Sequence, residues 1–292
     1  MRTKFNILFG DITGNCNLRC PFCVNDWPNV AHLKPMGGLE FGKFLKLGSQ
    51  LSDEYSLSCG MEPTLHPLLS EFVGLIPLEG TAFLTTNLSV DLSDDKIDGL
   101  AHSNLKRIQV SVESLKPDVY EYYRRGAKWA TFLHNLERLS AAVKGRQFPE
   151  LHSISMAFEG NLEALPMMLV ELGQYGFKRH EIRTPFPFTR AFAPDVFHRE
   201  FITGTQLSKL RDIIGSIGNV HYLGPDVPKC EDGGNNTGQV GEAPAFAFAF
   251  ADGTIMLPDG SWANFGELED PVAEIRRRIM LPRTVGTPSN SG

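Results

Sequence analysis

The chain has 292 residues, of which 42% are hydrophobic and 21% charged, as in an ordinary globular protein with one large domain or one domain and a small appendage. This composition excludes disordered, collagen-like and acidic-tail classes. A net charge of −6 gives no positive field for phosphate backbones, and no apolar run approaches the roughly 18 residues that cross a bilayer, so we expect neither a nucleic-acid nor a membrane partner.

Short apolar segments alternate with amphipathic stretches through the first three quarters of the chain. The expected strands are Phe5–Asp11, Tyr55–Ser58, Gly80–Thr86, Arg107–Val112, Ser153–Phe158 and His180–Thr184. The expected helices are Gly42–Leu51, Leu68–Leu75, Ser93–Leu100, Pro117–Tyr123, Trp129–Val143, Leu162–Tyr175 and Thr205–Ile217. Repeated alternation of this kind predicts an α/β fold with a parallel sheet.

The last quarter of the chain differs in composition. Residues 224–244 are rich in Gly and Pro, which is typical of a loop. Alternating Phe and Ala then lead to Asp252-Gly253, and an apolar segment resumes at Thr254–Leu257, a pattern that predicts a β-hairpin. We expect a closing helix at Pro271–Met280 and a disordered tail over residues 283–292.

Three of the five cysteines lie within eight residues, directly after the first expected strand. Cys16, Cys20 and Cys23 form the pattern Cys-x3-Cys-x2-Cys. The odd cysteine count and this crowding disfavour a secreted disulfide framework. The N-terminal apolar stretch is too short for a signal peptide, so we expect a cytoplasmic protein whose reduced cysteines bind an inorganic centre.

Two kinds of inorganic centre are compatible with three neighbouring thiolates. A structural zinc site needs a fourth protein ligand, and no Cys or His follows at finger-like spacing. A [4Fe–4S] cluster held by three thiolates keeps one iron open, and an open metal position is where a substrate or cosubstrate binds. The cluster is therefore the favoured interpretation, and the zinc site is its alternative.

The cysteine pattern, with the aromatic Phe22 before the third cysteine, resembles the signature of the radical S-adenosylmethionine (SAM) superfamily. The resemblance implies that Cys16, Cys20 and Cys23 hold one [4Fe–4S] cluster and that the amino and carboxylate groups of SAM chelate its fourth iron. One electron then cleaves SAM to methionine and a 5′-deoxyadenosyl radical, which abstracts hydrogen from the substrate. A one-electron reductant of the flavodoxin or ferredoxin type is implied as a partner.

Further segments match the superfamily in order and spacing, over residues 5 to about 220. Residues 58–67 resemble its Gly-Gly-Glu-Pro segment, and residues 110–114 its Ser-x-Asp/Glu strand end. Residues 84–89 resemble its Thr-Asn-Gly turn, with Leu in place of Gly. Arg124 falls where related enzymes place an arginine that pairs with a carboxylate. The SAM-binding residues that the resemblance implies, besides Phe22, are Gly60, Met61, Glu62, Asn87, Ser111, Glu113 and Arg124.

The same resemblance implies a fold and a domain organisation. We expect a partial (β/α)6 TIM-like barrel over residues 1–222, open on one side, with the cluster and SAM at the carboxyl ends of its strands. Residues 223–282 resemble the C-terminal extension of SPASM and twitch members, with a small β-hairpin and a helix. The cysteines of an auxiliary cluster are missing from this extension, so we expect one cluster in the protein.

Cys59 and Cys230 are the two cysteines outside the pattern. Without an auxiliary cluster, the electron left on a substrate radical has no iron–sulfur acceptor, which favours a redox-neutral outcome. Radical SAM epimerases resemble this arrangement, so we expect Cys230 to be the catalytic thiol that returns hydrogen to the substrate. An inert, buried Cys230 is the alternative. We expect Cys59 to be structural and packed behind the SAM-binding turn.

The expected substrate is a small polar molecule of the natural-product type. The short segment before Cys16 leaves little room for a module that grips a leader peptide. The acidic balance of the chain favours an amine-rich sugar such as an aminoglycoside, as in antibiotic biosynthesis. Candidate polar groups at the barrel mouth are Glu159, His180, Arg183, Asp226 and Glu231, and residues 186–201 are a candidate lid.

Two alternatives to an epimerase stay open from the sequence. Within the superfamily, a dehydrogenase or lyase acting on a small molecule or a peptide is the rival. From a different class, a non-catalytic iron–sulfur or zinc-binding protein would carry the same cysteines without turnover.

Overall fold

The structure, a computed structural model, describes residues 4–23, 34–184, 204–223 and 245–280. Through them runs a ten-stranded sheet in the order β10-β9-β8-β1-β2-β3-β4-β5-β6-β7. The strands are β1 Phe5–Gly10, β2 Ser52–Ser56, β3 Ala82–Thr86, β4 Arg107–Ser111, β5 Glu150–Met156, β6 Phe177–Arg183, β7 Val220–Leu223, β8 Phe246–Ala249, β9 Thr254–Met256 and β10 Trp262–Asn264. Strands β1 to β7 are parallel, β8 pairs parallel with β1, and β9 and β10 follow antiparallel.

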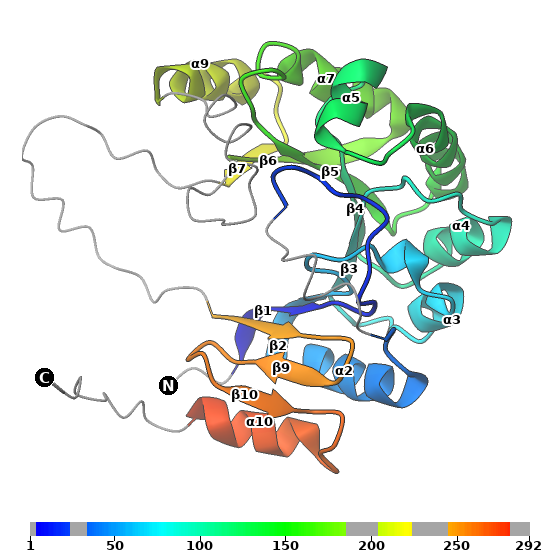
Figure 1. Cartoon of the computed structure of the whole chain (residues 1–292), viewed down its shortest axis with the longest axis vertical. Coiled ribbons are helices and arrows are strands. Elements are labelled where there is room, and N and C mark those ends of the chain that lie inside the picture. The colour runs from blue at the N-terminus through cyan, green and yellow to red at the C-terminus, as the bar shows by residue number, and fades with distance from the viewer. Residues whose placement is uncertain (1–3, 24–33, 185–203, 224–244, 281–292) are drawn as a thin grey trace, which may run out of the picture.

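Helices cover the convex side of this curved sheet, and none of the described helices covers its concave side (Figure 1). The α-helices are α2 Gly38–Leu51, α3 Leu69–Gly74, α4 Asp94–Ala101, α5 Pro117–Tyr123, α6 Trp129–Val143, α7 Leu165–Leu172, α9 Gly204–Gly215 and α10 Pro271–Met280. Crossovers between neighbouring parallel strands are right-handed, which places successive helices on one face. The result is a partial barrel.

The main hydrophobic core lies between the sheet and its helical layer. Leu8, Leu84 and Ile108, from three different strands, are fully buried there. Gly10 at the end of β1 allows close packing of α2, because a Cβ at this position would come within 2.4 Å of the Phe44 ring. Any larger residue at position 10 would force the Phe44 ring or α2 to move.

The predicted fold class is confirmed as an α/β fold with an open parallel barrel. The helices predicted at Pro117–Tyr123, Trp129–Val143 and Pro271–Met280 match at both ends, and the predicted hairpin is β8–β9. The prediction was wrong about where four strands begin: β3 starts two residues later than predicted, at Ala82, whereas β2, β5 and β6 start three residues earlier, at Ser52, Glu150 and Phe177. Their first halves carry charged residues that face the concave side of the sheet, so they lack the apolar pattern of a strand.

Two strands were not predicted, β7 and β10. Both are short, and short segments carry little periodic signal. The pairing of β8 with β1 makes the hairpin continuous with the barrel sheet. The C-terminal helix α10 packs against α2, on the convex side (Figure 1).

Several predictions lie outside the described residues. These are the tail over 283–292, the candidate lid over 186–201, the catalytic thiol Cys230 and the mouth residues Asp226 and Glu231. Among the helices that the structure describes, none has both the length and the apolar character required to cross a membrane.

Candidate active site

The loop that follows β1 carries the three patterned cysteines at the carboxyl edge of the sheet. All three are half-buried, and the N–H of Cys23 donates to the carbonyl of Cys20 at 3.0 Å, which closes a turn between them. The N–H of Leu18 donates to Sγ of Cys16 at 3.4 Å. Because the carboxyl ends of parallel strands meet at this edge, the loop lies beside the segments that follow β2, β3 and β4.

Burial determines the protonation of these thiols. It raises the pKa of Cys16 to about 12, and the nearby Glu62 carboxylate acts in the same direction. It also raises the pKa of Cys20 to about 11, against the opposing charge of Arg124. Such thiols become thiolate ligands when a cationic centre replaces their protons.

The donor set fits an iron–sulfur cluster better than a single metal ion. Within the described ranges, no three Cys, His, Asp or Glu side chains converge as they would around one ion. A [4Fe–4S] cluster does not require this convergence, because each thiolate binds a different iron. Three thiols on one wrapped loop are therefore sufficient, and they would leave the fourth iron open.

Asn87 ties the cysteine loop to the end of β3. Its Nδ2 lies 3.7 Å from Sγ of Cys16 and donates to Oδ1 of Asn17 at 3.0 Å. Its Oδ1 accepts the N–H of Ser89 at 2.8 Å, which fixes the orientation of the amide. Hydrogen bonds to a ligand sulfur orient it and tune the metal centre.

Glu62 is a buried structural carboxylate as well as a predicted SAM-binding residue. Its Oε1 accepts the N–H of Thr64 at 3.1 Å and the hydroxyls of Thr64 and Thr86 at 2.6 and 2.7 Å. Its Oε2 accepts the N–H of Asn87 at 2.7 Å. Burial raises the pKa of Glu62, and these four hydrogen bonds oppose the shift. Glu62 thus joins the segment after β2 to the turn after β3.

Asp11 is a site residue that the sequence analysis missed. Its Oδ1 accepts the N–H groups of Cys59, Gly60 and Met61 at 2.8, 3.0 and 3.0 Å. Burial raises the pKa of Asp11, and the same hydrogen bonds lower it. A carboxylate directly after a strand that leads into a metal-binding loop is the signal that could have revealed Asp11.

Glu113 and Arg124 form a buried ion pair beside the second cysteine. Nε and Nη2 of Arg124 donate to the two carboxylate oxygens of Glu113 at 2.5 and 2.6 Å. The Arg124 side chain is 12% exposed and the Glu113 side chain is 0% exposed. The third nitrogen, Nη1, lies 3.9 Å from Sγ of Cys20. The guanidinium also lies over the Phe22 ring, 5.2 Å from its centroid. The structure thus brings three of the predicted site residues together around Cys20.

The turn after β3 has the backbone conformation that the sequence pattern implies, although its Gly is replaced. Leu88 has a φ of 51°, in the left-handed region that normally favours glycine. Its side chain is fully buried, and its carbonyl accepts Nδ2 of the buried Asn135 at 2.9 Å. Packing and this hydrogen bond hold the residue in its unfavourable conformation.

Ser111 ends β4, on the same face of the strand as Gln109. It is buried, and its hydroxyl makes no hydrogen bond within the described part of the chain. This hydroxyl is therefore open to a hydrogen bond with a ligand.

Cys59 is exposed, so the prediction that it packs behind the turn was wrong. The segment is fixed by the convergence of three consecutive N–H groups on Asp11, and side-chain packing of Cys59 is not required. Such a concave array of N–H groups around a carboxylate is a stable arrangement by itself.

The predicted mouth residues have mixed outcomes. Arg183 ends β6 and is ion-paired with Glu181. Glu159 is exposed and accepts Nε2 of Gln206. The prediction that His180 lies at the barrel mouth was wrong. His180 is buried within β6, with its Nδ1 2.8 Å from the hydroxyl of Ser153.

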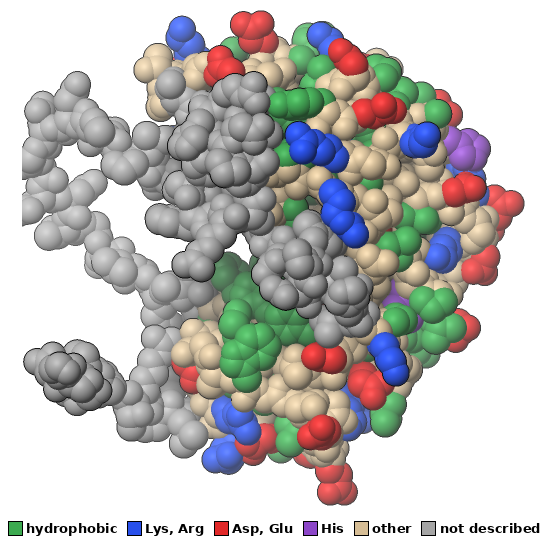
Figure 2. Space-filling view, in the orientation of Figure 1, with side chains coloured by type: hydrophobic (Ala, Val, Ile, Leu, Met, Phe, Trp, Pro, Cys, Tyr) green, Lys and Arg blue, Asp and Glu red, His purple; other side chains and the backbone are tan. Residues whose placement is uncertain are grey.

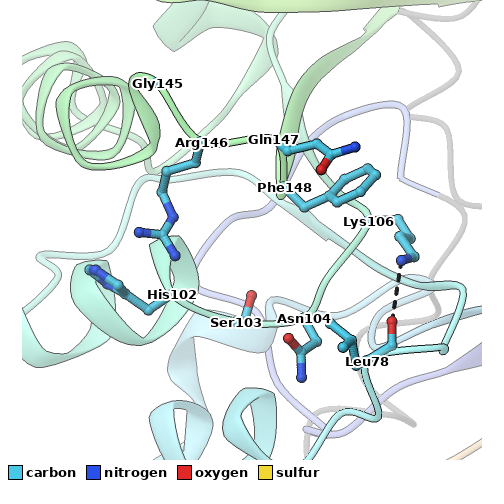
Figure 3. Close-up of a pocket in the computed structure, with 9 residues that line it drawn as sticks. All are labelled: Leu78, His102, Ser103, Asn104, Lys106, Gly145, Arg146, Gln147 and Phe148. Carbon is cyan, nitrogen blue, oxygen red and sulfur yellow. Dashed lines mark hydrogen bonds between the residues drawn. The ribbon is translucent and has the colours of Figure 1, made fainter.

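A separate cavity of about 420 Å³ opens at the opposite edge of the sheet (Figure 3). It is lined by Leu78, His102, Ser103, Asn104, Lys106, Gly145, Arg146, Gln147 and Phe148. These residues lie in segments that precede β3, β4 and β5, whereas the cysteine loop follows β1. The cavity therefore lies away from the candidate active site.

Comparison with known proteins agrees with the iron–sulfur site that the geometry of the cysteine loop indicates. The sequence profile described as "Radical SAM superfamily" matches residues 11–161, from Asp11 through the cysteine loop to the segment after β5. The match spans half of the chain. The chain belongs to the radical SAM superfamily.

Curated relatives match part of the chain. GTP 3′,8-cyclase of Syntrophomonas wolfei is 29% identical over 129 residues, which are 42% of this chain and 38% of that protein. GTP 3′,8-cyclase of Aquifex aeolicus is 32% identical over 114 residues, 37% of this chain and 35% of that protein. The matched region thus spans less than two fifths of the length of either relative.

Solved structures share the fold over almost the whole chain. SuiB of Streptococcus suis bound to S-adenosylmethionine superposes with a TM-score of 0.65 at 13% identity, over 94% of this chain and 68% of that one. Native anSMEcpe with bound AdoMet superposes with a TM-score of 0.57 at 14% identity, over 92% of this chain and 80% of that one. At such identities the likeness shows the fold.

Members of the superfamily use a [4Fe–4S] cluster and SAM. In this chain Cys16, Cys20 and Cys23 would hold the cluster, and residues 60–62, Asn87 and the Glu113–Arg124 pair lie around them. The cluster and SAM, once bound, would supply one-electron chemistry for hydrogen abstraction from an unactivated C–H bond. The residues described above would position these groups.

Proposed function

We propose that the protein is a radical SAM epimerase that abstracts hydrogen from a small polar molecule and returns hydrogen from Cys230 to the opposite face of the same carbon. The observation that carries the radical step is the cysteine loop at the carboxyl edge of the barrel. The bonds that join it to Asn87, and the contact of Cys20 with Arg124, support a preformed site.

The cysteine count supports a redox-neutral reaction. Three of the five cysteines belong to the loop, and Cys59 and Cys230 are too few to bind a second cluster of four thiolates. The substrate C–H bond breaks when its hydrogen moves to the adenosyl carbon, and the substrate radical then takes hydrogen from the Cys230 S–H bond. An electron from a flavodoxin- or ferredoxin-type reductant and a proton from water restore the thiol, so the substrate is not oxidised.

The cytoplasm is the compartment that suits this chemistry. The free cysteines and the electron donor both require reducing conditions.

The alternatives differ in their products. The names of the curated relatives favour a cyclisation of a nucleotide such as GTP. A dehydrogenase would release a product two hydrogens lighter, and a lyase would release fragments. A non-catalytic iron–sulfur or zinc protein would not cleave SAM after reduction.

The decisive experiment compares the wild type with Cys230→Ala and with Cys59→Ala in D2O, after anaerobic cluster reconstitution. We expect the wild type and Cys59→Ala to form a product with one added deuterium and no other mass change. Cys230→Ala should still form 5′-deoxyadenosine but no epimer. Full turnover by Cys230→Ala would eliminate this thiol as the hydrogen donor, and a cyclised or oxidised product would eliminate epimerisation.

A further inference from the structure

In strand β8 the small residues face the helices and the large residues face the concave side of the sheet. This is the reverse of what is expected of a barrel strand. Its sequence is Phe-Ala-Phe-Ala. Ala247 and Ala249 face the helix side and are buried, whereas Phe246 is 36% exposed on the concave side. Burial in the hydrophobic core accounts for the two alanines. It does not explain why two phenylalanines face the open interior, since exposed aromatic surface has a free-energy cost in water.

The aromatic rings form a continuous wall on the concave side. Phe9 of β1 is stacked with Phe248, with centroids 5.5 Å apart and an interplanar angle of 12°, and lies 5.9 Å from Phe246. Across β2, Phe9 meets the edge of Phe83 at 6.4 Å. Hydrophobic side chains gather in this hollow of the molecule (Figure 2). We call Phe9, Phe83, Phe246 and Phe248 the aromatic wall.

A polar wall continues directly from the aromatic one. The guanidinium of Arg107 lies 3.8 Å from the centroid of Phe83 and donates to both carboxylate oxygens of Glu54, at 2.7 and 2.9 Å. Gln109 then bridges the strands, since it contacts Oγ1 of Thr85 at 3.2 Å and donates to Oε2 of Glu181 at 3.3 Å.

A cavity of about 320 Å³ lies against this polar wall. It is lined by Glu54, Arg107, Gln109, His152, Ser153, Arg179, His180, Glu181 and His221. The two carboxylates in this lining are both ion-paired: Glu54 with Arg107, and Glu181 with Arg183. Of the two arginines in the lining, Arg107 is paired and Arg179 is exposed at the rim.

Paired charges select a particular kind of ligand. A carboxylate that is already neutralised by an arginine still accepts and positions hydrogen bonds, but it does not supply the net negative charge that a polyamine needs. A polyanion would likewise need several unpaired cations. Fixed, neutral arrays of donors and acceptors suit hydroxyl groups, which both donate and accept.

We propose that the concave side of the sheet, from the aromatic wall to the cavity of about 320 Å³, binds a neutral, polyhydroxylated ring molecule, a glycoside or a cyclitol, with its apolar C–H face on the aromatic wall and its hydroxyls on the Glu54–Arg107 and Gln109–Glu181 groups. The proposal rests on the proposed function, because it assigns the substrate class of that site. It differs from the amine-rich sugar that the overall charge of the chain favours. The aromatic wall contacts the apolar face of the ring, and the paired polar groups form hydrogen bonds with the hydroxyls at its edge.

The test uses saturation-transfer NMR on the reconstituted holoenzyme with SAM. The neutral probes are methyl α-D-glucopyranoside and myo-inositol, and the charged comparators are kanamycin A and GTP. We expect saturation of the protein aromatic protons to reach the neutral rings, and the comparators to show weaker transfer. Charged probes that bind more tightly than both neutral ones, or no transfer to either neutral ring at millimolar concentration, would overturn the proposal.

Two variants separate ring stacking from folding. Phe248→Leu keeps an apolar side chain and removes the ring face, and we expect binding of the neutral probes to weaken about tenfold. Phe148→Leu changes an exposed phenylalanine in the cavity at the opposite edge of the sheet and should bind as the wild type does. Unchanged binding by a Phe248→Leu protein with wild-type iron content and melting temperature contradicts the proposal. Formation of 5′-deoxyadenosine is measured separately, so failure of the radical chemistry would not be mistaken for failure of ring binding.

Discussion

Arg124 and Glu113 are joined by two hydrogen bonds, of 2.5 and 2.6 Å, and the third nitrogen of Arg124 points to the sulfur of Cys20. The carboxylate is fully buried and the guanidinium nearly so. A bidentate pair of this kind is geometrically rigid. It therefore holds a positive group at a fixed place beside Cys20, a predicted cluster ligand.

Replacing Arg124 by Gln should lower the reduction potential of the cluster. The added electron is stabilised by the nearby guanidinium, so loss of the positive charge and of the contact with the Cys20 sulfur favours the oxidised form. We expect a decrease of roughly 60 mV, which corresponds to a tenfold change in a one-electron equilibrium. An EPR-monitored redox titration of the reconstituted protein without SAM measures it.

Glu113→Gln is the matched control for this prediction. It removes the negative partner and keeps the guanidinium, so the potential should rise instead of fall. It should also destabilise the fold by about 3 kcal/mol, because a buried cation loses its partner. Shifts of the same sign in both variants would show that the charge of the pair does not tune the cluster.

Leu88 is the residue whose replacement tests the strained turn. Glycine would relieve the strain of the left-handed conformation, which would stabilise the fold by about 1 kcal/mol. It would also remove a fully buried leucine side chain, which costs about 3 kcal/mol or more. We expect burial to dominate, so that Leu88→Gly lowers the free energy of unfolding in urea by about 2 kcal/mol.

Asn219 provides the comparison for Leu88. It also has a positive φ, of 56°, but its side chain is exposed. Asn219→Gly should therefore change the free energy of unfolding by less than about 0.5 kcal/mol. A stabilising Leu88→Gly would mean that strain outweighs packing at this turn.

His180 should make the stability of the protein depend on pH. Burial, assisted by the nearby His152, lowers the pKa of His180 from 6.5 to about 4. Between these pH values the unfolded chain binds a proton that the folded chain does not, so this contribution to stability is complete above pH 6.5 and is lost as pH falls toward 4.

His180→Gln should remove this pH dependence, which amounts to about 3 kcal/mol at most in the free energy of unfolding. Unfolding free energies from urea titrations at several pH values measure it, and the exposed His134→Gln on α6 is the matched control. If His180→Gln and the wild type lose stability in parallel as the pH falls, His180 is not the responsible group.

The structure predicts different iron contents for the cysteine variants. Cys16→Ala, Cys20→Ala and Cys23→Ala should each fail to hold the cluster, because each removes one of three ligands. Cys59→Ala should keep about four irons per chain, since the exposed Cys59 is fixed through its backbone and not its sulfur. Iron and sulfide analysis after anaerobic reconstitution measures this. About eight irons in the wild type would instead reveal a second cluster.

Part of the fold and of the site could be predicted because the responsible signals are local. Helix Trp129–Val143 was predicted at both ends because its apolar residues recur with helical period along one face. The cysteine spacing predicted the cluster because three ligands of one small inorganic centre must lie close in sequence when a single loop carries them. The amino halves of β2, β5 and β6 were missed because their side chains face a polar interior, which removes the apolar alternation.

The sequence by itself indicated the parallel α/β class, three thiols for a cluster, and, in order, the segments that resemble SAM-binding ones. Only the tertiary structure decided which groups of the chain contact one another. Asp11 meets the N–H of Gly60, and Glu54 meets Arg107, because the order of the parallel strands brings distant segments together at one edge and one face. No local pattern reveals which charges neutralise each other or that the rings of β1 and β8 form one wall. These depend on the register and curvature of the sheet, which arise when the whole chain packs.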